Sequence, residues 1–266
     1  MTRPSPRAHF NSSRLVRFLT ENALLEAARS EDDVGQRLGD WLNFRQAIAL
    51  HGVLNPESPV EQAPHMRRAA PMSGEALSRH VDKVRAQLEQ SILQGAPPGS
   101  GLTRIEMPPA ELDEPIDPKT AFEPYRRFYA AHQRQMESTL QTLRAQVRAQ
   151  LAKGSSALQQ LATLDAAFEN ILAEREAALL AKVAKLHEKR FAQAVKAHTK
   201  RQAQAIQQVG ADADPADNTA LLSPTAPWLM PLRQAMRMAL LAELDTRLQP
   251  TLGLLEAFNQ ENPQQP

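Results

Sequence analysis

The chain has 266 residues, a net charge of +1 at neutral pH and no cysteine. The lack of cysteine excludes disulfides, a thiolate nucleophile and cysteine-bound zinc. Because 31 basic residues face 30 acidic ones, binding of nucleic acid through bulk charge is disfavoured. No run approaches the ~18 apolar residues that span a bilayer, and residues 1–14 lack the apolar segment of a secretory signal. We therefore expect a soluble, cytoplasmic protein without a membrane span.

The N-terminal segment, residues 1–53, predicts two helices. Asn11 or Ser12 can cap the first, and apolar spacing predicts the second over about 30–50. The proline-rich stretch 54–72 is expected to be a linker.

A third helix is predicted over 73–94, followed by a proline-rich, acidic linker over 95–119. The linker holds the glycine-rich stretch 95–103. A phosphate-binding loop needs Gly-Lys-Ser/Thr at the start of a helix. No lysine follows the glycines here, so a turn is expected.

The central segment, 120–209, predicts a long helical hairpin. No proline occurs between Pro124 and Pro215, and β-branched residues are scarce, which favours helix over strand. Gly154 with its flanking serines marks a turn between helices of about 122–152 and 156–209, with Ser156 expected in a capping box.

Both arms carry a narrow apolar stripe, typical of a coiled-coil-like seam. The first stripe is Phe122, Tyr125, Tyr129, His132, Met136, Leu140, Leu143, Val147 and Leu151. The second is Leu158, Leu161, Leu164, Phe168, Leu172, Leu179, Val183, Leu186, Phe191, Val195, Ile206 and Val209. If Leu172 and Leu179 are buried, replacing either with Ala should cost ~2–5 kcal/mol.

The C-terminal part is expected to be a loop over 210–224, a helix within 225–260 that stops at Pro250 before a further turn or two, and a polar tail over 261–266.

The second arm is longer than the first, so its end needs another apolar partner. We expect 190–209, 228–248 and 74–94 to form a small bundle, with the Gly154 end a bare two-helix arm. Trp41 and Phe44 would be buried in or near that bundle. The alternative is that a second copy covers the overhang, giving a homodimer. Either way the predicted fold class is all-α: an elongated helical hairpin joined to a small multi-helix bundle.

Six segments resemble a bacterial family catalogued as domain of unknown function 3348. They read NSSRLVRFL (11–19), QRLGDWLNF (36–44), AIAL (47–50), FEPYRR (122–127), LLAKVAKLHEKRF (179–191) and LLAELDTRLQP (240–250). The resemblance implies no activity, ligand or catalytic residue. Genes of this family tend to lie beside genes for envelope proteins, so the resemblance implies an envelope-associated setting.

No catalytic, cofactor-binding or metal-binding residues are predicted. His187 and His198 lie eleven residues apart on one helix, roughly 16 Å, which is too far for one metal ion. His132 lies on the apolar stripe and is expected to be a satisfied core histidine. Arg175 occupies a core-like position from which its head group should reach water. Scattered carboxylates form no acid–base pair, so an enzyme is disfavoured.

A basic stripe is the remaining signal. Its residues are Lys182, Lys185, Lys189, Arg190, Lys196, Lys200 and Arg201. The only acid among residues 182–201 is Glu188, which leaves a local charge of +6. The five lysines step by 3, 4, 7 and 4 and so share one helix face.

The stripe has three interpretations. It is a solvated face, partly neutralised by this chain's own acids at Glu106, Glu111, Asp113, Glu114 and Asp117; or it binds an acidic protein; or it binds nucleic acid. Nucleic acid is disfavoured because no aromatic residues are interleaved for base stacking. Three function classes follow: a helical scaffold or adaptor, a nucleic-acid-binding accessory protein, and an enzyme with a cryptic site.

Overall fold

The computed structural model describes residues 14–21, 42–54, 72–110, 112, 116–209 and 227–262. Its helices are α1 (Arg14–Glu21), α3 (Phe44–Leu54), α4 (Gly74–Gln94), α5 (Pro118–Leu151), α6 (Ser156–Val209) and α7 (Met230–Glu261), with a 3₁₀ turn, η3, at Pro227–Leu229. These ranges contain no strand, so the all-α prediction is confirmed.

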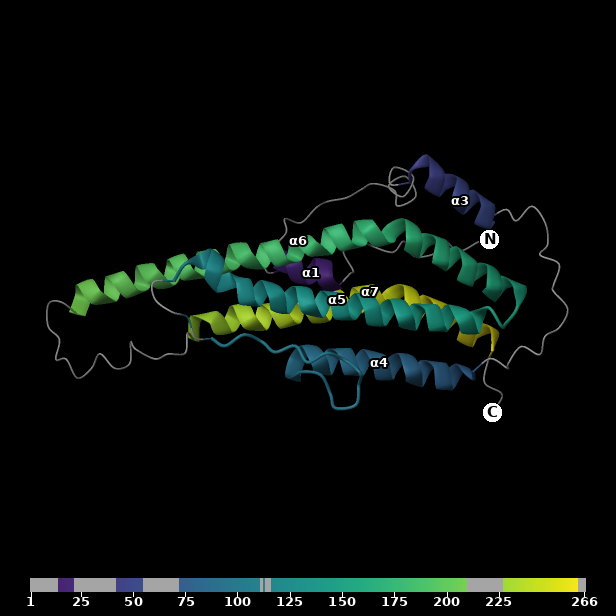
Figure 1. The fold of residues 1–266 in the computed structure, drawn as a ribbon, viewed down its shortest axis with the longest axis horizontal. Coiled ribbons are helices and arrows are strands. Elements are labelled where there is room, and N and C mark those ends of the chain that lie inside the picture. The colour runs from purple at the N-terminus through teal and green to yellow at the C-terminus, as the bar shows by residue number, and fades with distance from the viewer. Residues whose placement is uncertain are drawn as a thin grey trace, which may run out of the picture.

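The molecule is elongated, with α4, α5, α6 and α7 running along its length (Figure 1). α5 and α6 form the predicted antiparallel hairpin. α7 runs parallel to α5, since Tyr129 of α5 bonds Glu243 near the middle of α7 and Ser155 at the hairpin turn bonds Glu261 at its end. α1, α4, α5 and α6 all pack against α7.

The hairpin begins earlier than predicted. Asp117 caps α5 by accepting hydrogen bonds from the amides of Lys119 (3.3 Å) and Thr120 (3.4 Å), and Pro118 occupies the first helical turn, where its missing N–H costs nothing. Pro124 therefore lies inside the helix instead of starting it.

The turn at Gly154 is confirmed in place but differs in detail. Ser155, not Ser156, caps α6, because its Oγ accepts the amide of Leu158 at 3.2 Å. Gly154 is not in the left-handed region. A Cβ there would lie 2.7 Å from Leu158 Cδ1, so the glycine makes room for a side chain of the next helix.

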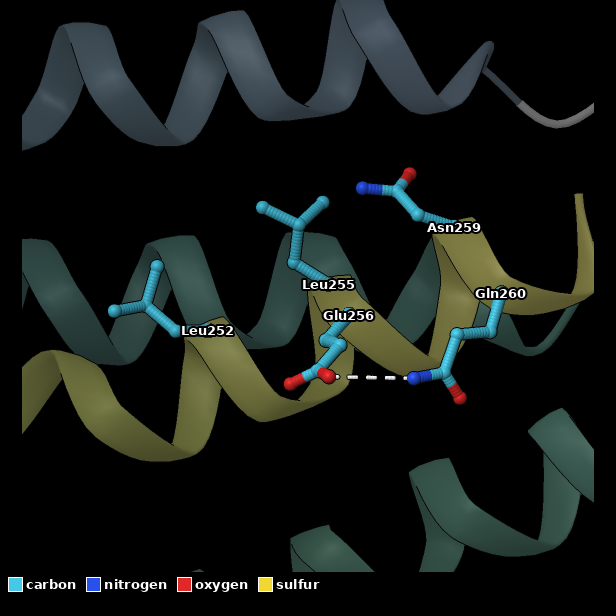
Figure 2. Close-up of a pocket in the computed structure, with 5 residues that line it drawn as sticks. All are labelled: Leu252, Leu255, Glu256, Asn259 and Gln260. Carbon is cyan, nitrogen blue, oxygen red and sulfur yellow. Dashed lines mark hydrogen bonds between the residues drawn. The ribbon is translucent and has the colours of Figure 1, made fainter. Parts of the chain in front are cut away.

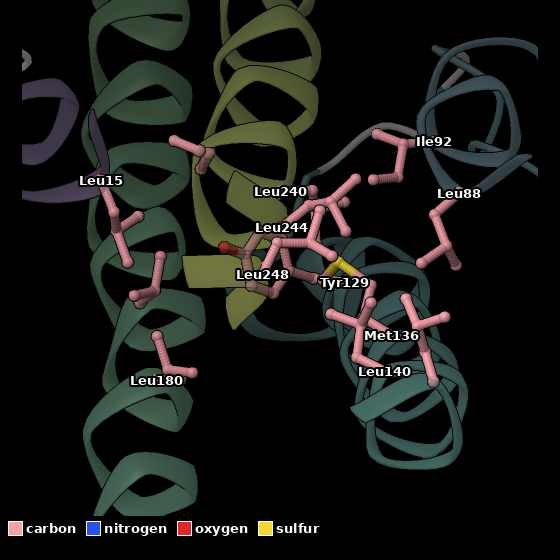
Figure 3. Close-up of a cluster of buried hydrophobic side chains, with 14 of the residues drawn as sticks. Leu15, Leu88, Ile92, Tyr129, Met136, Leu140, Leu180, Leu240, Leu244 and Leu248 are labelled. Atoms are coloured by element: carbon pink, nitrogen blue, oxygen red, sulfur yellow. The ribbon is translucent and has the colours of Figure 1, made fainter. Parts of the chain in front are cut away.

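The α5 stripe is confirmed at every position, because all nine predicted residues are buried. Its neighbours in the core come from α7 and α4, as Figure 3 shows for Tyr129, Met136 and Leu140 facing Leu240, Leu244 and Leu88.

The α6 stripe is only partly right. Val183, Phe191 and Val195 are buried, but Leu179 is 55% exposed and Leu180 takes the core position. Arg175 is exposed, as expected. The stripe breaks because the inward side of α6 is charged over an earlier stretch, where Arg144 of α5 bonds Asp165, and because residues 173–179 are all exposed.

α7 does not stop at Pro250 but continues through it to Glu261. A proline inside a helix costs ~3 kcal/mol. Buried residues lie on both sides of it, including Leu248 before and Leu254 and Phe258 after, while Pro250 itself is exposed. Burial of the following turns outweighs the lost hydrogen bond.

The predicted bundle is wrong in two respects. Among the described helices, α4 packs on α7 and α5 and not on α6. The Gly154 end is not bare, because α7 runs the length of the hairpin and the α4 N-terminus at Gly74 lies against Asn259.

The overhang of α6 is shorter than expected. Phe122 of α5 contacts Phe191 of α6, with ring centroids 5.4 Å apart, so residue 191 is still paired with the first arm. The predicted return of the C-terminal helix is seen as far as His198, which stacks on Trp228.

Phe44 is 81% exposed, so its predicted burial is wrong, and Trp41 lies outside the described residues. The single helix expected over 30–50 is interrupted. Asn43 and Gln46 exchange amide-to-side-chain hydrogen bonds of 2.9 and 3.0 Å that start α3 at Phe44. Phe44 is therefore the first residue of α3, and its side chain lies on the exposed face of that helix.

We predict a large difference between two α6 positions. Phe191→Ala should lower the free energy of unfolding by ~3–5 kcal/mol because the ring is fully buried among Phe122, Tyr125 and Trp228. Leu179→Ala should cost less than ~1 kcal/mol because half the side chain is already in water. Urea titration of both variants checks this; equal costs would contradict the phase of α6.

Removal of α7 should unfold the rest of the protein. A chain truncated after Gly210 loses the helix against which α1, α4, α5 and α6 pack. We expect it to aggregate and to lose its cooperative melting transition, as followed by circular dichroism and light scattering. A monodisperse product with an unchanged Tm would show that α7 is dispensable.

Candidate functional site

The basic stripe lies on the outer face of α6. Lys182, Lys185, Lys189, Lys196 and Lys200 are exposed, as is Arg201, while Arg190 is half-buried. At 100° per residue the lysines fall opposite the side of α6 that holds the buried Val183, His187, Phe191 and Val195. The structure thus brings together the five lysines as one exposed, cationic edge of the molecule, whereas Arg190 and the exposed Arg201 lie on other sides of the helix.

The stripe is not neutralised by the acids that the structure describes. The five lysines and Arg201 form no ion pair with any described residue. Of the acids expected to answer it, Glu106 pairs with Arg104 at 2.7 Å and Asp117 caps α5. Glu111, Asp113 and Glu114 lie outside the described residues.

An aromatic stack on the inner side of α6, opposite the lysines, was missed by sequence reasoning. His198 of α6 stacks on Trp228 of η3, with ring centroids 4.9 Å apart and an interplanar angle of 18°, and Trp228 also contacts Phe191 at 6.3 Å. Thirty residues separate the two stacked rings in the chain. The one sequence signal for this contact is Trp228, an isolated tryptophan just before an apolar helix, which indicates that this end of the molecule is packed.

A second polar cluster is buried in the middle of the core. Glu243 of α7 is fully buried and receives hydrogen bonds from Tyr129 (3.2 Å), Gln133 (3.0 Å) and Arg247 (3.0 Å). Arg247 also pairs with Glu176 of α6 at 3.3 Å. Burial raises the pKa of Glu243 despite these donors, and burial raises the pKa of Tyr129 well above its ordinary value. Because every oxygen of Glu243 is engaged inside the helix bundle, the cluster ties α5, α6 and α7 together and offers no opening to a substrate.

Two core histidines are less well satisfied than expected. His132 Nε2 and both ring nitrogens of His187 have no hydrogen-bond partner among the described residues. His187 packs its ring on Tyr129 at 5.3 Å, and His132 packs on Phe128 at 4.7 Å. Burial lowers the pKa of each to about 4, helped by Arg190 near His187 and Arg237 near His132. Both imidazoles are therefore neutral near pH 7.

The glycine-rich stretch forms a turn, as predicted. Gly99 and Gly101 have positive φ, which glycine adopts without strain, and Ser100 bonds back to Pro97 O at 2.6 Å. The amide of Thr103 donates to Gln135 of α5 at 2.8 Å, which holds the turn against the hairpin.

Two hollows on the described part of the chain contain no reactive grouping. The depression in Figure 2 is lined by Leu252, Leu255, Glu256, Asn259 and Gln260, all from α7. Gln260 donates a hydrogen bond to Glu256, and Asn259 donates one to Ser78 of α4.

A second hollow of about 160 Å³ lies where α6 parts from α5 and α7. Its charged residues include Arg144, bonded to Asp165, and Arg247, bonded to Glu176. The described residues contain no group of three or more His, Asp or Glu side chains placed to hold a metal ion.

The described helices include none long and apolar enough to cross a membrane. Fold and surface together define an elongated all-α protein with one cationic edge. A family model described as protein of unknown function, DUF3348, matches residues 1–260, and the chain belongs to this family. No curated protein and no solved structure matches it.

The buried histidines predict acid sensitivity. Their folded-state pKa of about 4 lies below the ~6.5 of an unfolded histidine. The free energy of unfolding is therefore not reduced by these histidines above pH ~6.5. It falls as the pH drops toward 4, by on the order of 3 kcal/mol for each histidine. His187→Leu should flatten the fall in unfolding free energy between pH 6.5 and 4, measured by urea titration.

The matched control is His51→Leu on the exposed face of α3, which should leave the pH dependence unchanged. If His187→Leu and the unaltered chain lose stability in parallel over this range, His187 is not a source of the acid sensitivity.

Proposed function

We propose that this protein is a non-enzymatic helical scaffold or adaptor that uses the basic stripe of α6 to bind an acidic protein. The observation that carries the proposal is the stripe itself: six exposed cations over 182–201 without an ion pair to any described acid. Over 18 residues, a helix extends ~27 Å, so the charges form a line long enough for a macromolecular contact. Solvated protein surfaces usually carry positive and negative side chains interspersed, whereas the exposed charges of this face are all positive.

The rigid backing of the stripe also supports a binding role. Behind Lys189, the buried Phe191 is held by Phe122, Tyr125 and Trp228, so the helix cannot readily rotate its lysines inward. A preorganised row of charges loses less conformational freedom on binding than one on a mobile loop. Genes of the family that this chain resembles tend to lie beside genes for envelope proteins. This association suggests an envelope-associated assembly as the setting, with the protein itself in the cytoplasm.

Nucleic acid is the second candidate partner. The stack of Trp228 on His198 adds one aromatic pair near this end of α6, which the sequence alone does not reveal, but at 100° per residue His198 lies on the opposite side of the helix from Lys196 and Lys200. One stack, half-buried and engaged with Phe191, is fewer than the successive base platforms that single-strand binders use. An acidic protein therefore fits the observations better. An enzyme with a cryptic site is a third reading, supported by no grouping of the described residues.

Charge reversal tests the proposal. The chain with Lys185→Glu, Lys189→Glu and Lys196→Glu should fold and melt normally because all three side chains are exposed. Its recovery of partner proteins from native cells with solubilised membranes should fall at least tenfold, because the charge of the stripe changes sign. Mass spectrometry of both pull-downs gives the comparison.

A control carries the same charge change elsewhere, at the exposed Arg17, Lys83 and Arg134. It should recover the partners as the unaltered chain does. Unchanged recovery by the stripe variant would reduce the stripe to a solvated face, and recovery of DNA or RNA in place of protein would favour the second candidate.

A further inference from the structure

The partner of the stripe can be specified further from the shape of the face on which the lysines lie. The outer side of α6 carries a line of eight positions that step by three or four residues, and all eight are exposed. They are Ala178, Ala181, Lys185, Lys189, Ala192, Lys196, Thr199 and Ala203. The line contains no bulky apolar or aromatic side chain, and its spacing keeps it on one side of a straight α-helix for ~37 Å.

Small residues on a helix face let a second helix approach closely. Alanine at the contact line brings helix axes toward the short end of the usual 8–10 Å separation, and lysine stems can lie along the flanks of the partner with their ammonium groups at its edge. Lys182 and Lys200 lie beside the line and add charge at its two ends. The face therefore suits a helix whose own edge is acidic.

The same side of α6 already accepts a helix. α3 packs on α6 and lies along its N-terminal half, on the side away from α5 (Figure 1). Ile171, one heptad before Ala178 on the same line, is 8% exposed yet does not belong to the main core cluster, as expected for a residue facing away from the bundle. Beyond Glu174, an exposed acid on the same line, the exposed C-terminal half of this face continues the surface on which α3 lies.

We infer that the stripe binds an acidic amphipathic α-helix of a partner protein, which lies along residues 178–203 of α6 in line with α3. The inference rests on the proposed function and adds to it the form of the partner. Charge complementarity selects the acidic side of the partner helix, and the alanines determine how close it comes. An extended acidic chain or a nucleic acid would use the lysines but not the alanines.

The alanines give a test that leaves charge unchanged. In the full chain, Ala192→Trp places a large ring in the middle of the line without altering any lysine. Ala86→Trp on the exposed side of α4 is the matched control. The probes are a synthetic 28-residue helix with glutamates repeating every three and four residues on one face, a peptide of the same composition with its glutamates spread around the helix, and a 30-base-pair DNA duplex. Binding is measured by fluorescence anisotropy.

The patterned helix should bind at least tenfold more tightly than the spread peptide. This binding should weaken at least tenfold in Ala192→Trp and in the Lys185, Lys189 and Lys196 charge-reversal chain, and remain unchanged in Ala86→Trp. Equal binding of the two peptides, no binding of either, an unaltered affinity in Ala192→Trp, or tighter binding of DNA would each overturn the inference.

The two proposals fail in different ways. If charge reversal abolishes recovery of cellular partners but Ala192→Trp does not, the scaffold proposal stands and the helical form of the partner is wrong. If charge reversal leaves that recovery unchanged, the scaffold proposal itself fails, whatever the peptides do.

Discussion

The architecture depends on the burial of α7 on several sides at once. A helix with buried residues on several sides needs several partners, and α1, α4, α5 and α6 all pack against this one. Its buried face continues past Pro250, so the bundle extends to the hairpin turn at Ser155. The hairpin of α5 and α6 alone would expose its stripe, and α7 is what turns two long helices into a folded core.

Glu243 determines how the helices align around α7. Its carboxylate is buried and bonded to Tyr129 and Gln133 of α5 and to Arg247, which reaches Glu176 of α6. A shift of α5 by one turn, ~5.4 Å, would remove Tyr129 and Gln133, the two α5 donors, and leave the buried carboxylate with Arg247 of its own helix. A buried polar group that loses its hydrogen-bond partners costs ~1–3 kcal/mol. The apolar contacts alone would tolerate more than one register, so the polar cluster selects one of them.

Sequence patterning predicts all nine stripe positions of α5 because one continuous apolar stripe faces one continuous core, although it misses the buried Phe128 and the start at Pro118. It fails on α6 because the inward side of that helix is not apolar throughout. Leu158, Val183 and Phe191 face the bundle, whereas Asp165 and Glu169 on the same side of the helix form ion pairs with Arg144 and Arg148 between them. Periodicity treats all leucines alike and so placed Leu179 in the core. The exposure of the basic stripe was predictable from its spacing, but its lack of described acidic partners depends on which contacts the acids make in three dimensions.

The inner and outer sides of α6 also explain how one helix can serve both packing and display. Its inner side is ion-paired where Asp165 meets Arg144 and apolar where Phe191 meets Phe122 and Trp228, and its lysines lie on the exposed outer side. A helix 54 residues long buries only part of its surface in a bundle of this width, so the remainder must be solvated or bound. Charged residues of either sign, in any mixture, would keep the exposed half of α6 solvated. The exposed residues of this half combine one sign of charge with a line of alanines, which solvation alone does not require. A surface that binds another helix explains this combination better than a solvated surface does.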